Sequence, residues 1–329
     1  MAQHPGTYLE KQIHSQPAEL ERLRTDPSTR EQVHTAAEGL HRVRRIWVVG
    51  TGSSQHAAAL GAAMLQDAGR SAHAVSSMQF VHNAPIVGPS DGVVIITHTG
   101  ETAYALAARS LAFGAGLQTF TIARRGIGLN DVVETVEKES AETYTVSYTA
   151  ALMVFAMIAG KMGAESLTED ALARVPAAVA AAISGPGTEG VPSRARFLAI
   201  VGAGPSAITA AEGALKAREA ARMLTAGYDA EYFLHGSATP LTTEDHLLAL
   251  TAADDDGFVE ALVRAGAAER IGVTTVAEPS ELPALLAQIP LAVRLQMFAS
   301  RAARERGTDP DTVITGAWAD PGLWAIGAP

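Results

Sequence analysis

The spacing of short apolar runs constrains the fold of this chain more than any other feature. The runs are six or seven residues long, are rich in β-branched residues and alternate with Ala- and Leu-rich stretches: "RIWVVG" (45–50), "GVVIIT" (92–97), "LQTFTIA" (117–123), "RFLAIVG" (196–202), "HLLALTA" (246–252) and "IGVTTVA" (271–277). Short, almost wholly apolar strands that alternate with helices are typical of parallel sheets covered on both faces. The sequence therefore predicts an α/β fold.

The two halves of the chain resemble each other. "WVVGTGSSQHAAALGAAML", from Trp47, is similar to "AIVGAGPSAITAAEGALKA", from Ala199, and a shift of 152 residues carries Gly50 onto Gly202. The same shift aligns Gly52 with Gly204, Ser54 with Ser206, and Ala59 with Ala211. An internal duplication of one α/β domain is the simplest explanation. The Gly- and Pro-rich stretch before 196 then predicts one domain at 1–183, a linker at 184–195 and a second domain at 196–329.

Composition excludes several classes of function. The chain has 329 residues, 47% of them hydrophobic, and a formal net charge of −10, which disfavours nucleic acid or an anionic membrane as a partner. No cysteine is present, so disulfides and thiolate metal sites are excluded. The first 20 residues lack the apolar stretch of a signal peptide, and the most apolar segment (150–160) is shorter than the roughly 20 residues of a membrane span. We expect a cytoplasmic protein.

Each half contains a Gly-x-Gly turn between an apolar run and an alanine-rich stretch. A dinucleotide site is one interpretation, but its fingerprint needs a third glycine, and Gln55 and Ala207 stand at those positions. No acidic residue ends a following strand about 20 residues on. The sequence therefore argues against an NAD-dependent oxidoreductase, and no cofactor is predicted.

Hydroxyl side chains gather where two predicted strands end. Ser53 and Ser54 follow the first apolar run, and "THTGET" (97–102) follows the second. Because parallel strands present their carboxyl ends at one edge of a sheet, both segments are expected at one ligand-binding crevice, where hydroxyls could hold a phosphate monoester. The alternative is that Thr99 merely caps the next helix, with Glu101 and Thr102 in its first turn. Capping would explain one threonine but not the cluster.

"GSS…THTGET" resembles the phosphate-binding signature of sugar isomerase (SIS) domains, and the duplication is similar to the isomerase half of glucosamine-6-phosphate synthase. The resemblance runs from "YLEKQIHSQPAEL" (8–20) through 212–236 to "RGTDPD" (306–311), and the sequence has no counterpart of the glutaminase domain. It implies two tandem SIS domains, each with a flavodoxin-like three-layer arrangement. The residues that it assigns to the sugar phosphate are Gly52, Ser53, Ser54, Thr97, His98, Thr99, Gly100, Thr102, Ser147 and Lys216.

The segment "EGALKAREAARML" (212–224) predicts a helix in which Glu212, Lys216 and Glu219 share one face. A solvated, ion-paired face is the alternative interpretation. The resemblance instead implies that Glu219, in the pattern E-G-A-L-K-x-x-E, is the catalytic base that moves a proton between C1 and C2 of the sugar. It also implies that His235 opens the ring or acts as general acid, often in the site of the neighbouring subunit of a homodimer.

Departures from the family leave the reaction open. The synthase has a reactive lysine in its C-terminal tail, whereas the last lysine here is Lys216, so Schiff-base chemistry from the tail is excluded. His98 replaces a glutamine, and Ser237 replaces a proline beside His235. This pattern is similar to SIS deaminases and deglycases, which release an amine from a 6-phosphorylated amino sugar or fructosamine. A non-catalytic sugar-phosphate sensor is the alternative, and no histidine spacing predicts a metal site.

Overall fold

The computed structural model describes residues 4–83, 87–252 and 256–329, which form two compact units that are each discontinuous in sequence. We name each unit after the first strand of its sheet along the chain. The β1 unit consists of Ala18–Glu139, Val146–Arg174 and Ile314–Pro329, and the β6 unit consists of Met1–Pro17, Ser140–Thr145 and Val175–Val313. The division falls inside helices α1 (Thr7–Thr25) and α7 (Glu169–Ser184).

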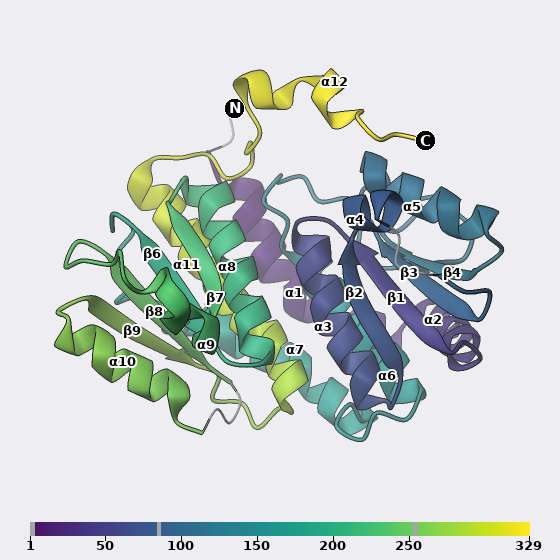
Figure 1. The fold of residues 1–329 in the computed structure, drawn as a ribbon, viewed down its shortest axis with the longest axis horizontal. Helices are drawn as coiled ribbons and strands as arrows, with labels where there is room; N and C mark the ends of the chain where they lie inside the picture. Colours follow the sequence, from purple (N-terminus) through teal and green to yellow (C-terminus); the bar gives the residue numbers. More distant parts are fainter. Residues whose placement is uncertain (1–3, 84–86, 253–255) are drawn as a thin grey trace. The chain divides into compact units, whose positions relative to one another are not determined.

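The β1 unit contains a parallel sheet in the order β2-β1-β3-β4-β5 (Figure 1). Its strands are β1 (Arg45–Gly50), β2 (Ser71–Ser76), β3 (Asp91–Ile96), β4 (Gln118–Ala123) and β5 (Val132–Glu134). Its further helices are α2 (Pro27–His41), α3 (Ser53–Asp67), α4 (Ser77–His82), α5 (Ala103–Gly114) and α6 (Val146–Lys161). Every residue of β3 is buried, as expected for a central strand with helices on both faces.

Two helical layers enclose this sheet. Val49, Val93 and Ile95 pack against Phe80 of α4 and against alanines of α5 on one face. On the other, α3 packs against α6, whose residues are buried from Val146 to Ala159. Gly61 of α3 lies against the ring of Phe155, because a Cβ atom at position 61 would meet that ring at 2.6 Å. The glycine thus permits close approach of the two helices.

The β6 unit has a parallel sheet in the order β7-β6-β8-β9. The strands are β6 (Leu198–Gly202), β7 (Thr225–Asp229), β8 (His246–Thr251) and β9 (Gly272–Ala277). Its helices are α8 (Pro205–Ala221), the short α9 (Ala230–Tyr232) with a π-helical turn η1 (Phe233–Ser237), α10 (Phe258–Ala268) and α11 (Ala284–Arg306). The order of elements from β6 to β9 repeats that from β1 to β4, and Gly213 of α8 lies against Leu295 of α11 as Gly61 lies against Phe155.

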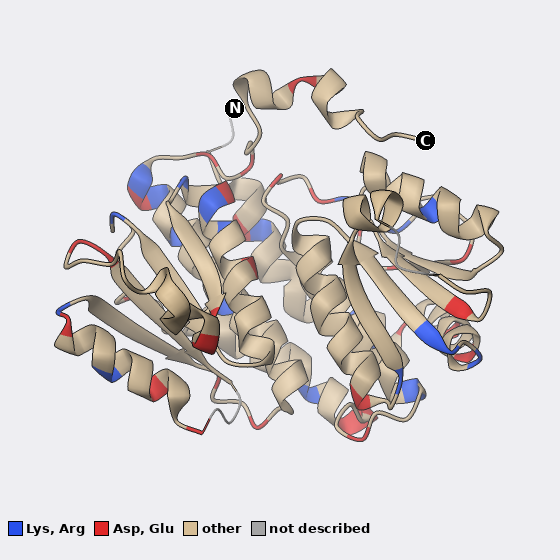
Figure 2. Cartoon of the chain, in the orientation of Figure 1, with Lys and Arg blue, Asp and Glu red and all other residues tan. Residues whose placement is uncertain are grey.

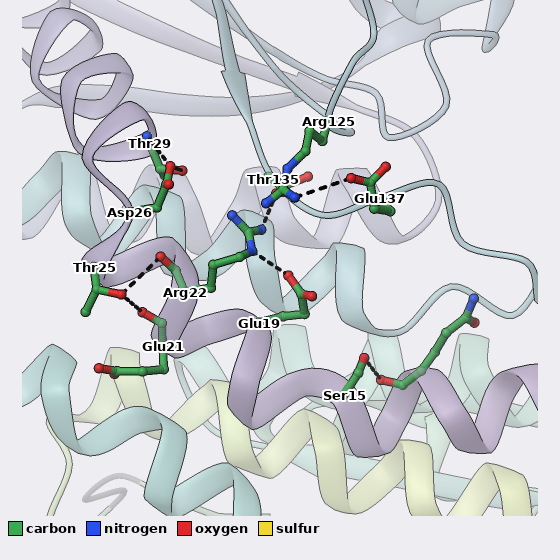
Figure 3. Close-up of polar contacts among 11 residues, drawn as sticks. Ser15, Glu19, Glu21, Arg22, Thr25, Asp26, Thr29, Arg125, Thr135 and Glu137 are labelled. Carbon is green, nitrogen blue, oxygen red and sulfur yellow. Dashed lines mark hydrogen bonds and ion pairs between the residues drawn. The ribbon is translucent and has the colours of Figure 1, made fainter.

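The joint between α1 and α2 shows how local chemistry fixes the connection between two helices (Figure 3). Asp26 is the N-cap of α2, and its carboxylate accepts hydrogen bonds from the backbone N–H and the hydroxyl of Thr29 at 2.8 and 2.9 Å. Arg22, near the end of α1, pairs with Glu19 at 2.8 Å and donates to the carbonyl oxygen of Thr135 at 2.6 Å. These contacts connect the joint between α1 and α2 to the chain just after β5.

The α/β fold and all six strands predicted from the apolar runs are confirmed, to within two residues at each end. Three strands were not predicted: β2 ("SAHAVS"), β5 ("VVE") and β7 ("TAGYD"). β2 and β7 lie at sheet edges and are largely exposed or half-buried, so they need few apolar residues. β5 has three residues and offers too short a pattern. Among the helices of the described ranges, none is long and apolar enough to cross a membrane.

Candidate functional site

The carboxyl edge of the sheet in the β1 unit has a topological switch point. β1 and β3 are hydrogen-bonded neighbours, with Val49 opposite Ile95, but β1 continues through α3 to β2 on one side and β3 continues through α5 to β4 on the other. Right-handed crossovers then place α3 and α5 on opposite faces of the sheet. Open α/β sheets bind ligands at the crevice between two such diverging loops.

Glycines fix the backbone of both loops. A Cβ atom on Gly50 would lie 2.2 Å from the carbonyl oxygen of Ser54, so only glycine lets β1 turn directly into α3. Gly52, the N-cap of α3, has φ 60° and ψ −132°, a conformation that side-chain-bearing residues rarely adopt. Gly100 has φ 70°, and its own Cβ position would be 2.6 Å from Ile127.

The hydroxyls predicted to bind phosphate lie at this edge. Ser53 and Ser54 open α3 and are half-buried, and Thr102 is exposed. Thr97 is only 2% exposed, and its Oγ1 atom has no hydrogen-bond partner among the described residues. A buried hydroxyl without a hydrogen-bond partner destabilises the folded state by about 1–3 kcal/mol. An oxygen atom of a bound ligand would supply that partner.

The capping alternative for Thr99 is wrong. α5 begins at Ala103 with Thr102 as its N-cap, so Glu101 and Thr102 precede the helix instead of forming its first turn. The hydroxyl of Thr99 accepts a hydrogen bond from the backbone N–H of Glu101 at 3.1 Å, which holds the loop and not the helix. Thr102 itself makes no side-chain cap bond.

His98 and Ser147 are connected through Glu139. The backbone N–H of Glu139 donates to Nε2 of His98 at 3.2 Å, so Nε2 is the acceptor and the ring proton lies on Nδ1. The carboxylate of Glu139, which is buried, accepts a hydrogen bond from the backbone N–H of Ser147 at 2.8 Å, at the start of α6. Burial lowers the pKa of His98, the charges of Arg124 and Lys138 lower it further, and Glu139 opposes them. His98 is therefore neutral at pH 7.

The β6 unit contains a buried row of charges on α8. Lys216 is 1% exposed, and its Nζ atom lies 2.5 Å from Oε2 of Glu219 and 3.6 Å from Oε1 of the equally buried Glu212. The solvated-face interpretation of this helix is therefore wrong for Glu212 and Lys216. The side chain of Glu219 is 22% exposed, and burial is nevertheless the largest influence on it, raising the pKa of its carboxyl despite the opposing charge of Lys216.

His235 is found on the surface of the β6 unit. It lies in η1 with φ −79° and ψ 41°, next to Gly236, whose φ is 112°. Its side chain is 74% exposed, and its partner is Glu231, whose Oε1 atom is 4.0 Å away. Among the described residues of this unit, no hydrogen bond or ion pair joins His235 to Glu219, so their pairing in catalysis stays a prediction.

Glu139 is the polar residue of the site that the sequence did not reveal. Glu139 stands in the charged stretch "EKES", which has the composition of a solvated loop. Only 6% of the surface of Glu139 is nevertheless exposed. Only the need of the buried start of α6 for a hydrogen-bond acceptor could have suggested that Glu139 is buried. Within the described ranges, no group of three or more His, Asp or Glu side chains is arranged to hold a metal ion.

The fold and this edge define an open α/β protein with a ligand site at a topological switch point. Residues 39–159 match the family model of the SIS domain, so this segment of the chain, which runs from the end of α2 into α6, is a SIS domain. The resemblance stated on "GSS…THTGET" is confirmed.

Curated relatives over most of the chain are isomerising glutamine–fructose-6-phosphate aminotransferases. That of Methanothermobacter thermautotrophicus is 26% identical over 92% of this chain and 55% of its own length. That of Thermococcus kodakarensis is 27% identical over 92% of this chain and 56% of its own length. The chain thus spans about half the length of the curated relatives that it matches.

Solved structures share the fold. The C-terminal domain of glucosamine-fructose-6-phosphate aminotransferase from Francisella tularensis has a TM-score of 0.75 at 18% identity, covering 93% of this chain and 97% of that one. Tagatose-6-phosphate ketose/aldose isomerase from Escherichia coli has a TM-score of 0.77 at 17% identity, with 95% and 99% coverage. Glucosamine-6-phosphate deaminase from Thermotoga maritima has a TM-score of 0.74 at 18% identity, with 93% and 97% coverage.

Proposed function

We propose that this chain is a phosphosugar isomerase of the SIS type that acts on a 6-phosphorylated sugar or amino sugar. The observation that carries the proposal is Glu219, a largely buried carboxylate that is held by a buried lysine and has a raised pKa. A base of this kind is suited to removing a proton from carbon near neutral pH, because its basicity exceeds that of an exposed glutamate.

In the proposed reaction, the hydroxyls of Ser53, Ser54, Thr97, Thr99 and Thr102 and the backbone at Gly52 and Gly100 bind the phosphate. Glu219 takes the proton from C2 or C1 and returns it to the neighbouring carbon through an enediol-type intermediate. Lys216 keeps Glu219 in position and favours its charged form. His98, held neutral by its surroundings, would add an Nδ1–H donor beside the threonines.

The narrower proposal is a deaminase or fructosamine-6-phosphate deglycase. No lysine follows Lys216 in the sequence, so the chain offers no tail amine to form a Schiff base with a ketose. In an amine-releasing reaction, Glu219 would move a proton between C1 and C2 so that the amine becomes an imine. Water would then add to the imine carbon, and His235 would protonate the nitrogen as the C–N bond breaks and a carbonyl group forms. We also propose that the chain comprises two tandem SIS domains (1–183 and 196–329, with a linker at 184–195) and acts as a cytoplasmic homodimer.

The proposal is tested by incubating the protein with fructose 6-phosphate, glucosamine 6-phosphate and fructosamine 6-phosphates in deuterium oxide. Amine release and deuterium at C1 and C2 are followed by NMR. We expect activity with at least one sugar, a loss of about 10²–10⁴-fold in Glu219→Gln, and unchanged sugar-phosphate binding. Glu260→Gln, which alters an exposed carboxylate of the same unit, is the matched control and should be fully active. Full turnover in Glu219→Gln would exclude the role assigned to it.

His235 is tested by complementation. Its exposure on η1 favours a role in the site of a neighbouring subunit. Glu219→Gln and His235→Ala subunits, each inactive alone, are co-expressed and purified together. If His235 acts across the dimer, one of the two sites in each mixed dimer is intact, and about a quarter of wild-type activity returns with random pairing. No recovery would mean that both residues act within one subunit.

A sensor is the second candidate. It would bind the same phosphosugars through the hydroxyl loops but leave C1 and C2 unexchanged. Sugar phosphates that raise the melting temperature without any exchange or release, across the whole panel, would favour this function. The buried charge row of Glu212, Lys216 and Glu219 argues against it, because a binder has no chemical need for a base with a raised pKa.

A further inference from the structure

A second cavity lies at the opposite edge of the sheet in the β1 unit. It has a volume of about 340 Å³ and is formed where β1, β2 and β3 begin, with Arg44, Ser71, His73 and Ser90 among the residues that line it. Strands of six residues separate it by about 20 Å from the loops at the carboxyl edge. The cavity is therefore distinct from the hydroxyl-lined site.

The one carboxylate in this cavity is already neutralised. Asp91 is 3% exposed, and its Oδ2 atom accepts hydrogen bonds from Nη2 of Arg45 at 2.6 Å, from Nε1 of Trp47 at 3.2 Å and from the backbone N–H of Gly88 at 3.0 Å. A carboxylate satisfied in this way leaves the charge of the remaining arginine uncompensated.

That remaining arginine is Arg44. Its backbone N–H donates to the carbonyl oxygen of Ser90, but its guanidinium group has no partner among the described residues, although it lines the cavity. Figure 2 shows basic residues at the start of β1 in a chain whose net charge is −10. Since most arginines of this protein are paired with a carboxylate or a carbonyl oxygen, an unpaired guanidinium in a cavity is an available anion ligand.

The walls add hydroxyl and aromatic groups. The Oγ atom of Ser71 lies 3.2 Å from Nε2 of His73, and Ser90 lines the same cavity. His73 is opposite Trp47 in the sheet, with ring centroids 5.3 Å apart, and Arg45 covers the same indole at 4.8 Å. His73, which lines the cavity, is thus held against a ring on the adjacent strand.

We propose that this cavity is a second anion site, which binds a small phosphate-bearing molecule through the guanidinium of Arg44 and the hydroxyls of Ser71 and Ser90. The arrangement suits a phosphate because a planar guanidinium donates two parallel hydrogen bonds to it while hydroxyls reach its other oxygens. The site is independent of the proposed reaction, and its occupant would be an effector or a bound ion and not the reacting sugar.

Trp47 provides a local probe, because its indole N–H is bonded to Asp91 at the cavity wall. Its indole signal in ¹H–¹⁵N spectra is assigned with Trp47→Phe, and inorganic phosphate is titrated at constant ionic strength against sodium chloride. A nucleoside monophosphate is titrated in parallel to distinguish free phosphate from a phosphate carried by an organic group. We expect a saturable shift with phosphate and none with chloride, and at least a tenfold weaker affinity in Arg44→Ala.

Two variants separate this site from the other. Arg42→Ala removes a neighbouring exposed arginine that does not line the cavity and should leave the titration unchanged. The double variant Ser53→Ala, Ser54→Ala alters the carboxyl-edge loops and should also leave the Trp47 shift unchanged. A non-saturable shift, an equal response to chloride, or an unaltered affinity in Arg44→Ala would overturn the proposal.

Discussion

The turn and helix after β1 and the turn and helix after β6 share a backbone but not a chemistry. Gly52 and Gly204 are both N-caps of the following helix, with φ 60° and 52° and ψ −132° and −127°. Gly50 and Gly202 both lie too close to the start of that helix for any Cβ atom. The two strand-to-helix turns therefore have the same backbone geometry in detail.

The side chains at equivalent positions of the two helices differ in polarity. The start of α3 is the more polar, whereas further along the helix α8 is the more polar. The helix after β1 opens with two half-buried serines, whereas the helix after β6 opens with Pro205 and the buried Ser206. Further along, the buried apolar Leu60 and Met64 of α3 correspond to the buried, charged Glu212 and Lys216 of α8.

The comparison indicates that the glycines determine only the geometry of the turn after each strand. The chemistry of each region is decided by a few side chains that the backbone does not constrain. The region after β1 has hydroxyls suited to an anion, and the region after β6 has a charged row suited to proton transfer. Exchanging residues between the two helices is therefore the most direct test of this division.

The largest expected effect comes from Lys216→Met, which gives α8 the residue that α3 has at the equivalent position. It leaves Glu212 buried without its cation, and breaking a buried ion pair in this way should lower the free energy of unfolding by about 3–5 kcal/mol. Urea denaturation at pH 7 measures it. The double variant Glu212→Leu, Lys216→Met copies both residues of α3 and should recover most of the lost stability, since it leaves no unpaired buried charge at 212. If the double variant is as unstable as the single one, α8 does not tolerate the packing of α3.

The same double variant tests the electrostatics of Glu219. Lys216 lowers the pKa of Glu219 through its charge and its hydrogen bond, and the charge of Glu212 raises it by less, so replacing both residues raises that pKa further. A general base is active only when ionised; turnover therefore increases as the pH rises through its pKa, and the acidic limb of the kcat/KM profile should move to higher pH. A limb that stays in place would show that another group controls it.

The next largest effects are expected when hydroxyls are removed at the carboxyl edge of the sheet in the β1 unit. Ser54→Ala and Thr97→Val should each weaken sugar-phosphate binding on the order of 10- to 100-fold, because each removes a hydrogen bond to a charged group. Ser206→Ala, at the equivalent position of the other copy, should have no effect on binding. Isothermal titration measures all three. Thr97→Val should at the same time raise the melting temperature of the free protein, since it removes an unsatisfied buried hydroxyl.

The smallest effects are expected at the shared glycines. Gly52→Ala and Gly204→Ala place a Cβ atom where no atom lies within 4 Å, so each should cost only the backbone strain of a positive φ, roughly 1 kcal/mol. Thermal unfolding of the two variants side by side checks whether the costs are equal. A clearly larger loss at one position would mean that the two turns are not equivalent.

The sequence predicted β1, β3, β4, β6 and β8 because they lie inside their sheets and are therefore almost wholly apolar. The edge strand β9 was predicted from its own β-branched residues. β2 and β7 were missed for the converse reason, since an edge strand such as "SAHAVS" carries polar residues and has no clear period. The charges at 212, 216 and 219 were predicted to share a helical face, but their burial was not predictable. It depends on α11, which packs on α8 from more than 60 residues further along the chain.

The sequence was sufficient to propose the residues of the candidate site, but not the contacts between them. The hydroxyl segments were located because both end predicted parallel strands, a relation that depends on topology alone. The link from His98 through Glu139 to Ser147 could not be predicted, because it depends on where an irregular segment of chain lies against α6. Likewise, no pattern in "YFLHGS" reveals that His235 lies exposed on a π-helical turn.

The paired contacts of Gly61 with Phe155 and of Gly213 with Leu295 have a consequence for how such sequences diverge. Because a methyl group at position 61 or 213 would overlap the opposing side chain, a larger residue there requires a smaller one at 155 or 295. Related sequences should therefore vary at these positions in pairs, within each copy and independently between the copies. The size of one residue on the helix after β1 would then forecast the size of a residue almost 100 positions away.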